Sequence, residues 1–283
     1  MPPRHIGVIG SGTMGSGIAQ VFAQSGFTVT LQDVSAPALD RARGGIEKSL
    51  AKFVEKGKVS ASDRDATLAH LSVTTDLAAL SSADFVVEAI IEDVEAKSRL
   101  FQSLDALVRP DVILSSNTSS ISLTRLGAAT SRPDRVLGMH FMNPVPLMTL
   151  VELIRGQSTS AESMAVATEL TRALGKTPVE SADYPGFIAN RILMPMINEA
   201  VFALMEGVGT AEAIDGVMKL GMNHPMGPLT LADFIGLDVC LAILDVLHGG
   251  LGDPKYRACP LLRRLVAAGH VGRKSGRGFY SYA

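Results

Sequence analysis

The sequence predicts an α/β fold in which a mostly parallel sheet domain is followed by an all-helical C-terminal domain. Short apolar segments typical of strands alternate with helical patterns as far as residue 183. This alternation indicates strand–helix–strand units with parallel strands. From residue 184 the pattern is helical almost to the end. We therefore divide the 283-residue chain into domains 1–183 and 184–283.

The composition excludes some classes of partner. It is that of an ordinary globular protein, with 47% hydrophobic and 19% charged residues. A net charge of −2 provides no positive field that would attract nucleic acid or an anionic membrane. The most apolar long segment, residues 229–247, contains three aspartates, which argues against a membrane span. We expect neither a nucleic-acid nor a membrane partner.

Two further features favour a cytoplasmic protein. Cys240 and Cys259 have neither a metal-ligand spacing nor a disulfide framework, so we expect reduced thiols and no metal site. The first strand follows Met1 to His5 directly, and these few residues leave no room for a signal peptide.

Residues 5–33 read as a strand, a glycine-rich turn, a helix and a second strand. Glycine-rich turns are common, but this context is the one in which a GxGxxG motif binds a dinucleotide. The glycines let the backbone approach a pyrophosphate, whose charge is favoured at the helix N-terminus. The first domain is therefore predicted to be Rossmann-like. The candidate cofactor-binding residues of the turn are Gly10, Gly12, Thr13, Met14 and Gly15.

Asp33 lies at the end of the second strand, where a carboxylate can accept hydrogen bonds from both ribose hydroxyls. It would repel the 2′-phosphate of NADP, and no arginine immediately follows it, so the sequence favours NAD. The alternative is that Asp33 only caps the next helix, although Ser35 and Pro37 already provide a good helix start.

A basic helix is predicted over residues 36–57. Ser49, Lys52 and Lys56 fall at i, i+3 and i+7, so they share one face and could meet the phosphates of a long anionic substrate. A solvated helix face explains the same spacing, and spacing alone favours that simpler interpretation.

Polar residues follow the predicted strands 83–90 and 112–116, where ligands of parallel sheets bind. Each of them is equally well explained by a cap or a loop hydrogen bond. These candidates are Glu92, Lys97, Asn117 and Ser119.

His140 emerges from the apolar run 135–141, and Glu152 follows in the predicted strand 150–154. A histidine with a nearby carboxylate is what a general base and its orienting partner require. A lone histidine in an apolar strand is more often structural, so the pair by itself leaves both interpretations open.

The remaining elements complete the two domains. A capping box at Thr159 to Glu162 is predicted to open a helix that ends at Gly175, before a last strand. The helical domain should contain helices near 188–204, 210–220, 229–247 and 260–268. Such a segment, with several apolar faces, is expected to pack on the first domain or on a second copy of itself.

Seven blocks of this sequence, in order, resemble the L-3-hydroxyacyl-CoA dehydrogenase family, and in particular its bacterial single-function members. The resemblance covers nearly the whole chain, and seven blocks in the right order are far more specific than any one of them. The blocks are residues 8–20, 85–90, 116–120, 138–146, 185–191, 226–238 and 272–280.

The resemblance implies reversible NAD-dependent oxidation of a 3-hydroxyacyl-CoA substrate to the 3-oxoacyl-CoA, by a homodimer joined through its helical domain. It assigns His140 as the catalytic acid/base and Glu152 as its partner. It places Ser119 and Asn190 around the substrate oxygen and the nicotinamide. Its further assignments are Asp33, Glu92, Lys97, Asn117, Ser119 and Asn143 for the cofactor, and Ser49 and Lys56 for the coenzyme A moiety.

Two rival functions share this architecture. A β-hydroxyacid dehydrogenase acts on free acids but normally relies on a lysine, whereas this chain offers His140 with Glu152. A non-catalytic, crystallin-like NAD-binding protein would keep the fold without turnover. The presence of every catalytic candidate argues against this second rival, although fold alone could not decide.

Overall fold

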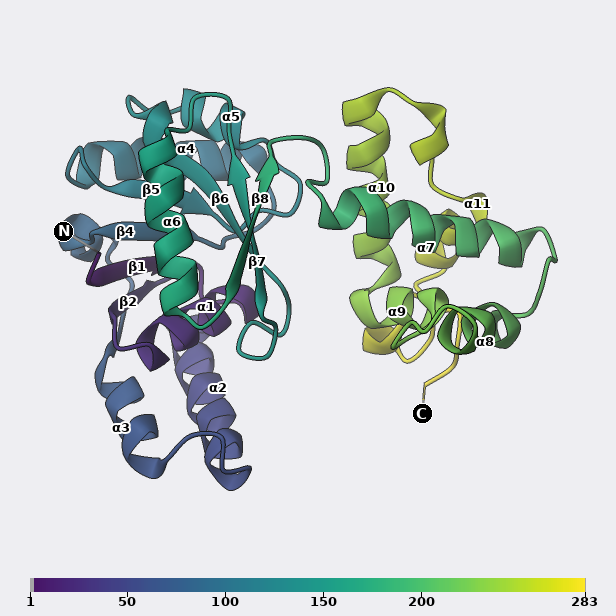
Figure 1. Ribbon diagram of the computed structural model, residues 1–283, viewed down its shortest axis with the longest axis horizontal. Coiled ribbons are helices and arrows are strands. Elements are labelled where there is room, and N and C mark those ends of the chain that lie inside the picture. The colour runs from purple at the N-terminus through teal and green to yellow at the C-terminus, as the bar shows by residue number, and fades with distance from the viewer. Residues whose placement is uncertain (1–2, 283) are drawn as a thin grey trace. The chain divides into compact units, whose positions relative to one another are not determined.

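The computed structural model describes residues 3–282, so Met1 and Pro2, which entered the argument about a signal peptide, lie outside the described residues. The chain folds into two compact units, Met1–Asp183 and Tyr184–Ala283 (Figure 1). We describe each unit by itself. Within residues 3–282, no helix is both long and apolar enough to cross a membrane.

The first unit is built on an eight-stranded sheet with the order β3-β2-β1-β4-β5-β6-β7-β8. Only β6 and β7 pair antiparallel among these strands, so the predicted mostly parallel, Rossmann-like sheet is confirmed. The strands are β1 (His5–Ile9), β2 (Thr28–Gln32), β3 (Leu71–Thr74), β4 (Phe85–Glu88), β5 (Ile113–Ser116), β6 (Val136–Phe141), β7 (Leu150–Arg155) and β8 (Thr177–Ala182).

Strand β3 is absent from the elements predicted above. It has four residues at the edge of the sheet, and only Leu71 is buried, so it lacks the apolar run that marks the central strands. Its partner β2 pairs with it in parallel, from Val29 opposite Leu71 to Gln32 opposite Thr74. Pairing with β2 in the folded chain, rather than a local sequence pattern, therefore determines that these residues form a strand.

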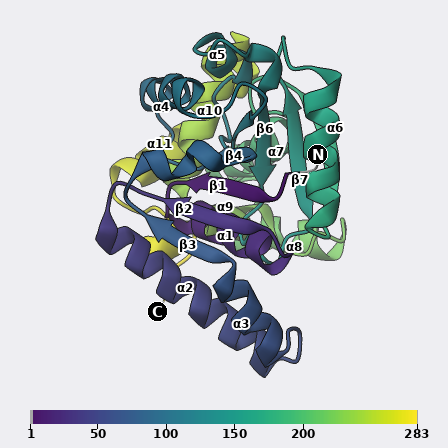
Figure 2. The same cartoon turned by 90° about the vertical axis from the view of Figure 1, so that its left-hand side faces the viewer.

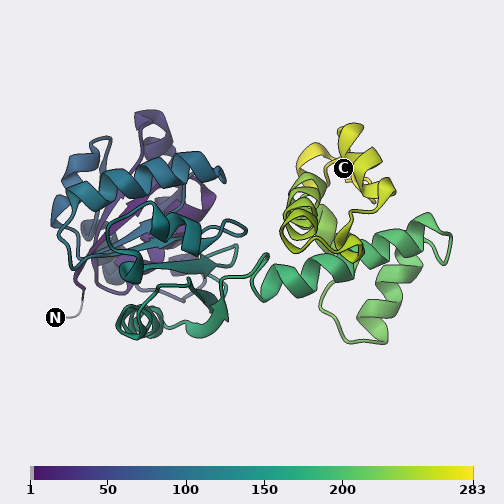
Figure 3. The same cartoon turned by 90° about the horizontal axis from the view of Figure 1, so that it is seen from above.

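Helices cover both faces of the sheet. One face carries the main hydrophobic cluster, to which α1, α2 and α6 contribute, and Figure 3 shows α4 (blue) and α6 (teal green) on opposite sides of the sheet. Helices α2 and α3 project past β3 (Figure 2). The helices are α1 (Thr13–Gln24), α2 (Ala36–Glu55), α3 (Ala61–Ala69), α4 (Val94–Leu107), α5 (Leu123–Ala128) and α6 (Ala161–Ala173), with 3-10 turns η1 (Leu77–Ser82) and η2 (Pro133–Arg135).

The start of α6 differs from the predicted capping box, which was wrong. Ser160 is the N-cap residue, and its hydroxyl accepts a hydrogen bond from the N–H of Ser163. Thr159 instead donates its hydroxyl proton to the carbonyl of Val136, 2.5 Å away. The threonine is buried against β6, which removes it from the helix start.

The second unit is helical, with its own apolar core. The single helix predicted over 229–247 is wrong, because Gly236 breaks it into α9 and α10. Gly236 has a φ of +108°, which L side chains rarely adopt, so the helix cannot continue through it. The elements are α7 (Ala189–Met205), α8 (Ala211–Leu220), α9 (Pro228–Ile235), α10 (Leu237–Leu251), η3 (Pro254–Tyr256), α11 (Pro260–Ala267) and η4 (Arg273–Ser275).

Two buried aspartates tie the C-terminal segment to this helical core. Asp215 accepts hydrogen bonds from the N–H of Leu229 and from the hydroxyl of Tyr280. Asp233 accepts from the N–H of Tyr280 and from the hydroxyl of Tyr282. A buried carboxylate is costly unless it is hydrogen-bonded, and these bonds provide that compensation. These hydrogen bonds therefore hold the C-terminal segment against the helices of the second unit.

Candidate active site

The antiparallel pairing of β6 with β7 places His140 directly opposite Glu152. Met139 and Phe141 belong to the main hydrophobic cluster. Because successive side chains alternate along a strand, His140 points to the other face, which carries α4. His140 Nδ1 lies 2.8 Å from Glu152 Oε2, and the two side chains are 9% and 3% exposed.

This contact determines which nitrogen of His140 is available for chemistry. A carboxylate oxygen only accepts hydrogen bonds, so the proton on Nδ1 is donated to Glu152. In the neutral ring Nε2 is then free of a proton and can take one up. The pair thus has the arrangement of a base with its orienting carboxylate.

Ser119 reaches His140 from the neighbouring strand. It lies in the loop after β5, and its hydroxyl oxygen is 3.2 Å from His140 Nε2. Asn117 anchors the same loop, because its Oδ1 accepts a hydrogen bond from the N–H of Phe141 at 2.9 Å. Ser119, His140 and Glu152 therefore form one row of polar contacts across three neighbouring strands.

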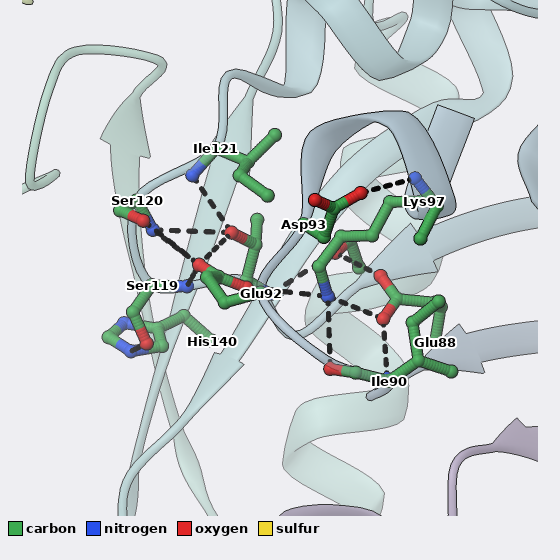
Figure 4. A network of polar contacts seen from close by, with 12 residues as sticks. Glu88, Ile90, Glu92, Asp93, Lys97, Ser119, Ser120, Ile121 and His140 are labelled. Carbon is green, nitrogen blue, oxygen red and sulfur yellow. Dashed lines mark hydrogen bonds and ion pairs between the residues drawn. The ribbon is translucent and has the colours of Figure 1, made fainter. Parts of the chain in front are cut away.

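Glu92 holds the backbone of this loop, as Figure 4 shows. Its Oε1 accepts hydrogen bonds from the N–H of Ser119 at 2.9 Å and from the Thr118 hydroxyl at 2.5 Å. Burial raises the pKa of Glu92, but the charge of Lys97 and the hydrogen bonds from Thr118, Ser119 and Ser120 outweigh that effect, so the pKa lies below its ordinary value. The side chain is therefore a stable anion at neutral pH.

Lys97, on α4, has a partner that the sequence analysis did not single out. Its Nζ lies 2.5 Å from Glu88 Oε1, and the two side chains are 1% and 0% exposed. It lies 3.4 Å from Glu92 Oε2. The available signal was an acidic residue that ends the otherwise apolar strand Phe85–Glu88, because a carboxylate is rarely buried without a partner.

A cavity of about 1070 Å³ lies along the glycine-rich turn and the end of β2. A Cβ at Gly10 would lie 2.5 Å from the carbonyl oxygen of Ala89, and one at Gly15 would lie 1.7 Å from that of Gly10. At Gly12, the N-cap of α1, a Cβ would meet nothing within 4 Å. Two glycines thus permit the turn, and the third leaves room for a pyrophosphate at the helix N-terminus.

Asp33 lines this cavity with its carboxylate fixed. Its Oδ2 accepts hydrogen bonds from the N–H and the hydroxyl of Ser11, each at 2.7 Å, and its Oδ1 accepts from the N–H of Ser35. The cap of α2 is Ser35, so Asp33 is not the capping residue. Burial raises the pKa of Asp33, but the hydrogen bonds from Ser11 and Ser35 outweigh it, and the pKa lies below its ordinary value.

The cavity wall contains residues that the sequence analysis missed. Ser11 binds Asp33 directly, and its position between the first two glycines of the motif was the available signal. Arg41, on α2, lines the same cavity, and its charge contributes to the lowered pKa of Asp33. It lies eight positions after Asp33 in the chain, so the fold of this segment brings the two together.

The remaining predicted site residues belong to other elements of the chain. Thr13 and Met14 line the cavity along the glycine-rich turn. Asn143 is exposed just beyond the end of β6. Asn190 belongs to the second unit, in the first turn of α7. The proposed coenzyme A residues are on α2, Ser49 half-buried in the helix and Lys56 at its C-cap. Within residues 3–282, no cluster of histidine, cysteine and acidic residues could hold a metal ion.

Comparison with known protein families identifies both units. The model of the 3-hydroxyacyl-CoA dehydrogenase NAD binding domain matches residues 5–184, and that of the C-terminal domain matches residues 186–282. The chain belongs to the 3-hydroxyacyl-CoA dehydrogenase family. As a member of this family it is an oxidoreductase, and its cofactor is NAD. The geometry of Gly12 and Asp33 fits that cofactor, because it offers space for a pyrophosphate and a fixed anion for a ribose.

Individual members of the 3-hydroxyacyl-CoA dehydrogenase family match over almost their whole length. The 3-hydroxybutyryl-CoA dehydrogenase of Bradyrhizobium diazoefficiens is 53% identical, with 99% of this chain and 95% of that protein covered. That of Clostridioides difficile is 50% identical, with 98% and 99% covered. The crystal structure of (S)-3-hydroxybutyryl-CoA dehydrogenase from Ralstonia eutropha superposes with a TM-score of 0.97 at 48% identity, covering 99% of each chain.

Proposed function

We propose that this enzyme catalyses the reversible, NAD-dependent oxidation of (S)-3-hydroxybutyryl-CoA to acetoacetyl-CoA. The observation that carries the proposal is the row Ser119–His140–Glu152 at the ends of paired strands, in a unit that also holds an NAD cavity. The relatives named 3-hydroxybutyryl-CoA dehydrogenase, at 50% and 53% identity, support the choice of substrate.

In the proposed mechanism His140 moves the proton. NAD, when bound, supplies the acceptor for the hydride that leaves C3 of the substrate. His140 Nε2 takes the proton of the substrate hydroxyl and returns it to the ketone in the reductive direction. Positioned proton transfer of this kind contributes about 10²–10⁴-fold to the rate. Glu152, hydrogen-bonded to Nδ1, holds the tautomer and stabilises the charged ring.

The other predicted site residues bind the substrate or the cofactor in this proposal. Ser119, whose hydroxyl oxygen lies 3.2 Å from Nε2, binds the substrate oxygen. Asn190 is assigned to the substrate by the resemblance of residues 185–191 to the family. Glu92, Lys97, Asn117 and Asn143 support the cofactor. Ser49 and Lys56 on α2 bind the phosphates of coenzyme A, for which the positive charge of Lys56 is suited.

The experiment that tests the function follows NADH absorbance with acetoacetyl-CoA, in parallel with free acetoacetate and with NADPH. We expect rapid oxidation only with the thioester and NADH. Turnover of free acetoacetate would instead indicate a β-hydroxyacid dehydrogenase. Tight NADH binding without any turnover would indicate a non-catalytic protein.

Asp33→Ala tests the choice of NAD over NADP. Hydrogen bonds to a charged group contribute about 1.5–3 kcal/mol each, so losing the ribose contact should raise the NADH dissociation constant roughly tenfold or more. NADPH should bind more tightly than it does to the unchanged enzyme, because the carboxylate no longer repels the 2′-phosphate and Arg41 lines the same cavity. Both constants are measured by quenching of the reduced cofactor's fluorescence.

The matched control for this prediction is the double variant Asp33→Ala/Arg41→Ala. It should lose the gain in NADPH affinity while keeping the weakened NADH binding. Unchanged NADH affinity in Asp33→Ala would show that this carboxylate does not bind the ribose.

We further propose that the enzyme is a cytoplasmic homodimer joined through its helical unit. Both cysteines are free and buried, as expected in a reducing compartment. The helical unit exposes large apolar side chains, including Ile192 (66%), Val208 (76%) and Leu220 (89%), which an interface would cover. Light scattering should give twice the mass of one chain, and a concentration-independent monomer would contradict the dimer. Cell fractionation tests the compartment.

A further inference from the structure

We propose that Glu88 is a positioning residue that holds the serine loop, residues 116–120, in the geometry that Ser119 needs to reach His140. This inference rests on the proposed function, and it assigns a role to a residue outside the cofactor and catalytic sets described above. The contacts that support it run from β4 through α4 to the loop (Figure 4).

The carboxylate of Glu88 is fully buried, and both of its oxygens accept hydrogen bonds. It is 0% exposed and is the last residue of β4. Its Oε1 accepts hydrogen bonds from Lys97 Nζ at 2.5 Å and from the N–H of Ile90 at 2.6 Å. Its Oε2 accepts from the hydroxyl of Ser116 at 2.6 Å. A group enclosed in this way cannot touch a ligand, so any role in turnover acts through its neighbours.

The first connection to the serine loop runs through Ser116. A serine hydroxyl has one proton, and Ser116 donates it to Glu88. The lone pairs of the same oxygen remain available, and one accepts a hydrogen bond from the N–H of Thr118 at 3.1 Å. Glu88 therefore orients the hydroxyl that fixes the first turn of the loop.

The second connection runs through Lys97, which lies between two carboxylates. Its Nζ is 2.5 Å from Glu88 Oε1 but 3.4 Å from Glu92 Oε2. The ammonium group lies closer to Glu88 than to Glu92, and its contact with Glu92 is to Oε2. Glu92 Oε1 therefore remains available to accept hydrogen bonds from the N–H of Ser119 and the hydroxyl of Thr118. Glu88 thus sets where the cation lies and leaves Glu92 to bind the loop.

Neutralising Glu88 should disturb both connections. Lys97 is 1% exposed, and Glu92 would be its remaining carboxylate partner among the ion pairs of residues 3–282. A buried cation that loses one partner is strongly driven toward another. As Lys97 approaches Glu92 it competes with the N–H of Ser119, and the serine hydroxyl then leaves its position near His140 Nε2.

The test is Glu88→Gln, which keeps the size and removes the charge. We expect kcat with acetoacetyl-CoA and NADH to fall roughly 10²-fold, the loss typical of a misplacement of about 1 Å at the reacting centre. The NADH dissociation constant should rise by a smaller factor than the factor by which kcat falls. Hydrogen–deuterium exchange of the loop amides should become faster, and the primary isotope effect with deuterated NADH should increase.

The matched control is Asp105→Asn. Asp105 lies on α4, the helix that carries Lys97, and pairs with Arg132 at 2.6 Å, with side chains 16% and 9% exposed. Its side-chain hydrogen bonds and ion pair go to Ser131 and Arg132, outside the serine loop. It should lower the melting temperature while leaving loop exchange unchanged and kcat within about threefold. Equal losses of kcat in the two variants, or unchanged loop exchange in Glu88→Gln, would overturn the proposal.

A milder variant covers the case in which Glu88→Gln does not fold. Ser116→Ala removes only the first connection, and it should speed exchange at Thr118 and lower kcat severalfold. Unchanged exchange in this variant counts against the proposal. Failure of the unaltered enzyme to reduce acetoacetyl-CoA would refute the proposed function, whereas the loop-exchange result would still decide the role of Glu88.

Discussion

His140→Gln should lower kcat by about 10²–10⁴-fold, the contribution of a positioned acid/base to proton transfer. Glutamine neither takes up nor gives a proton at neutral pH, so in the reduction of acetoacetyl-CoA the ketone oxygen would have to take its proton from water. NADH should bind with nearly unchanged affinity, because the cavity that we propose for the cofactor lies along the glycine-rich turn and is not lined by His140. Steady-state kinetics with acetoacetyl-CoA and fluorescence titration with NADH measure the two quantities.

His70→Gln is the matched control for that result. His70 lies in the same unit, at the C-cap of α3, and has no part in the proposed chemistry. We expect its kcat to stay within about twofold of the unaltered enzyme. Near-normal turnover in His140→Gln would show that another group transfers the proton.

Glu152→Gln should lower kcat by roughly 10²-fold, within the range that positioned proton transfer provides. An amide oxygen can still accept the hydrogen bond from Nδ1, but the charge that stabilises the protonated ring is lost. The effect should fall on kcat far more than on the NADH dissociation constant. Steady-state kinetics and fluorescence titration again separate the two.

Glu180→Gln makes the same change on the neighbouring strand β8. Glu180 pairs with Arg155 at the surface, with side chains 53% and 35% exposed, so its loss should have little effect. If Glu152→Gln only lowered the melting temperature and kept kcat, Glu152 would be a structural residue and the proposed pairing role would be wrong.

Local sequence patterns were sufficient to predict many of the elements of the first unit. The GxGxxG turn and the strand before it can be predicted from a few neighbouring residues. The turn is so tight that it has no room for a Cβ at Gly10 or Gly15, so glycine is required there. The central strands β4 and β6 are buried in full, so they appear as apolar runs. Elements without such a local signal, such as the edge strand β3, were missed.

The predicted helix boundaries were wrong where contacts with distant residues, or the backbone angle of a single residue, determine them. Thr159 and Ser160 are both suitable N-cap residues. Because the Thr159 hydroxyl donates its hydrogen bond to the distant carbonyl of Val136, Ser160 is the residue that caps the helix. The break at Gly236 was likewise invisible, because glycine is tolerated inside a helix and only its backbone angle shows the interruption.

By itself the sequence determined the fold class, the family and the cofactor motif, because these depend on residue types at short spacings and on seven blocks in order. Tertiary structure alone decided which side chains meet. The register of β6 against β7 placed His140 opposite Glu152 across twelve residues of chain. The buried contact of Glu88 with Lys97 also depends on packing, since a carboxylate loses its hydration only when a folded partner replaces it.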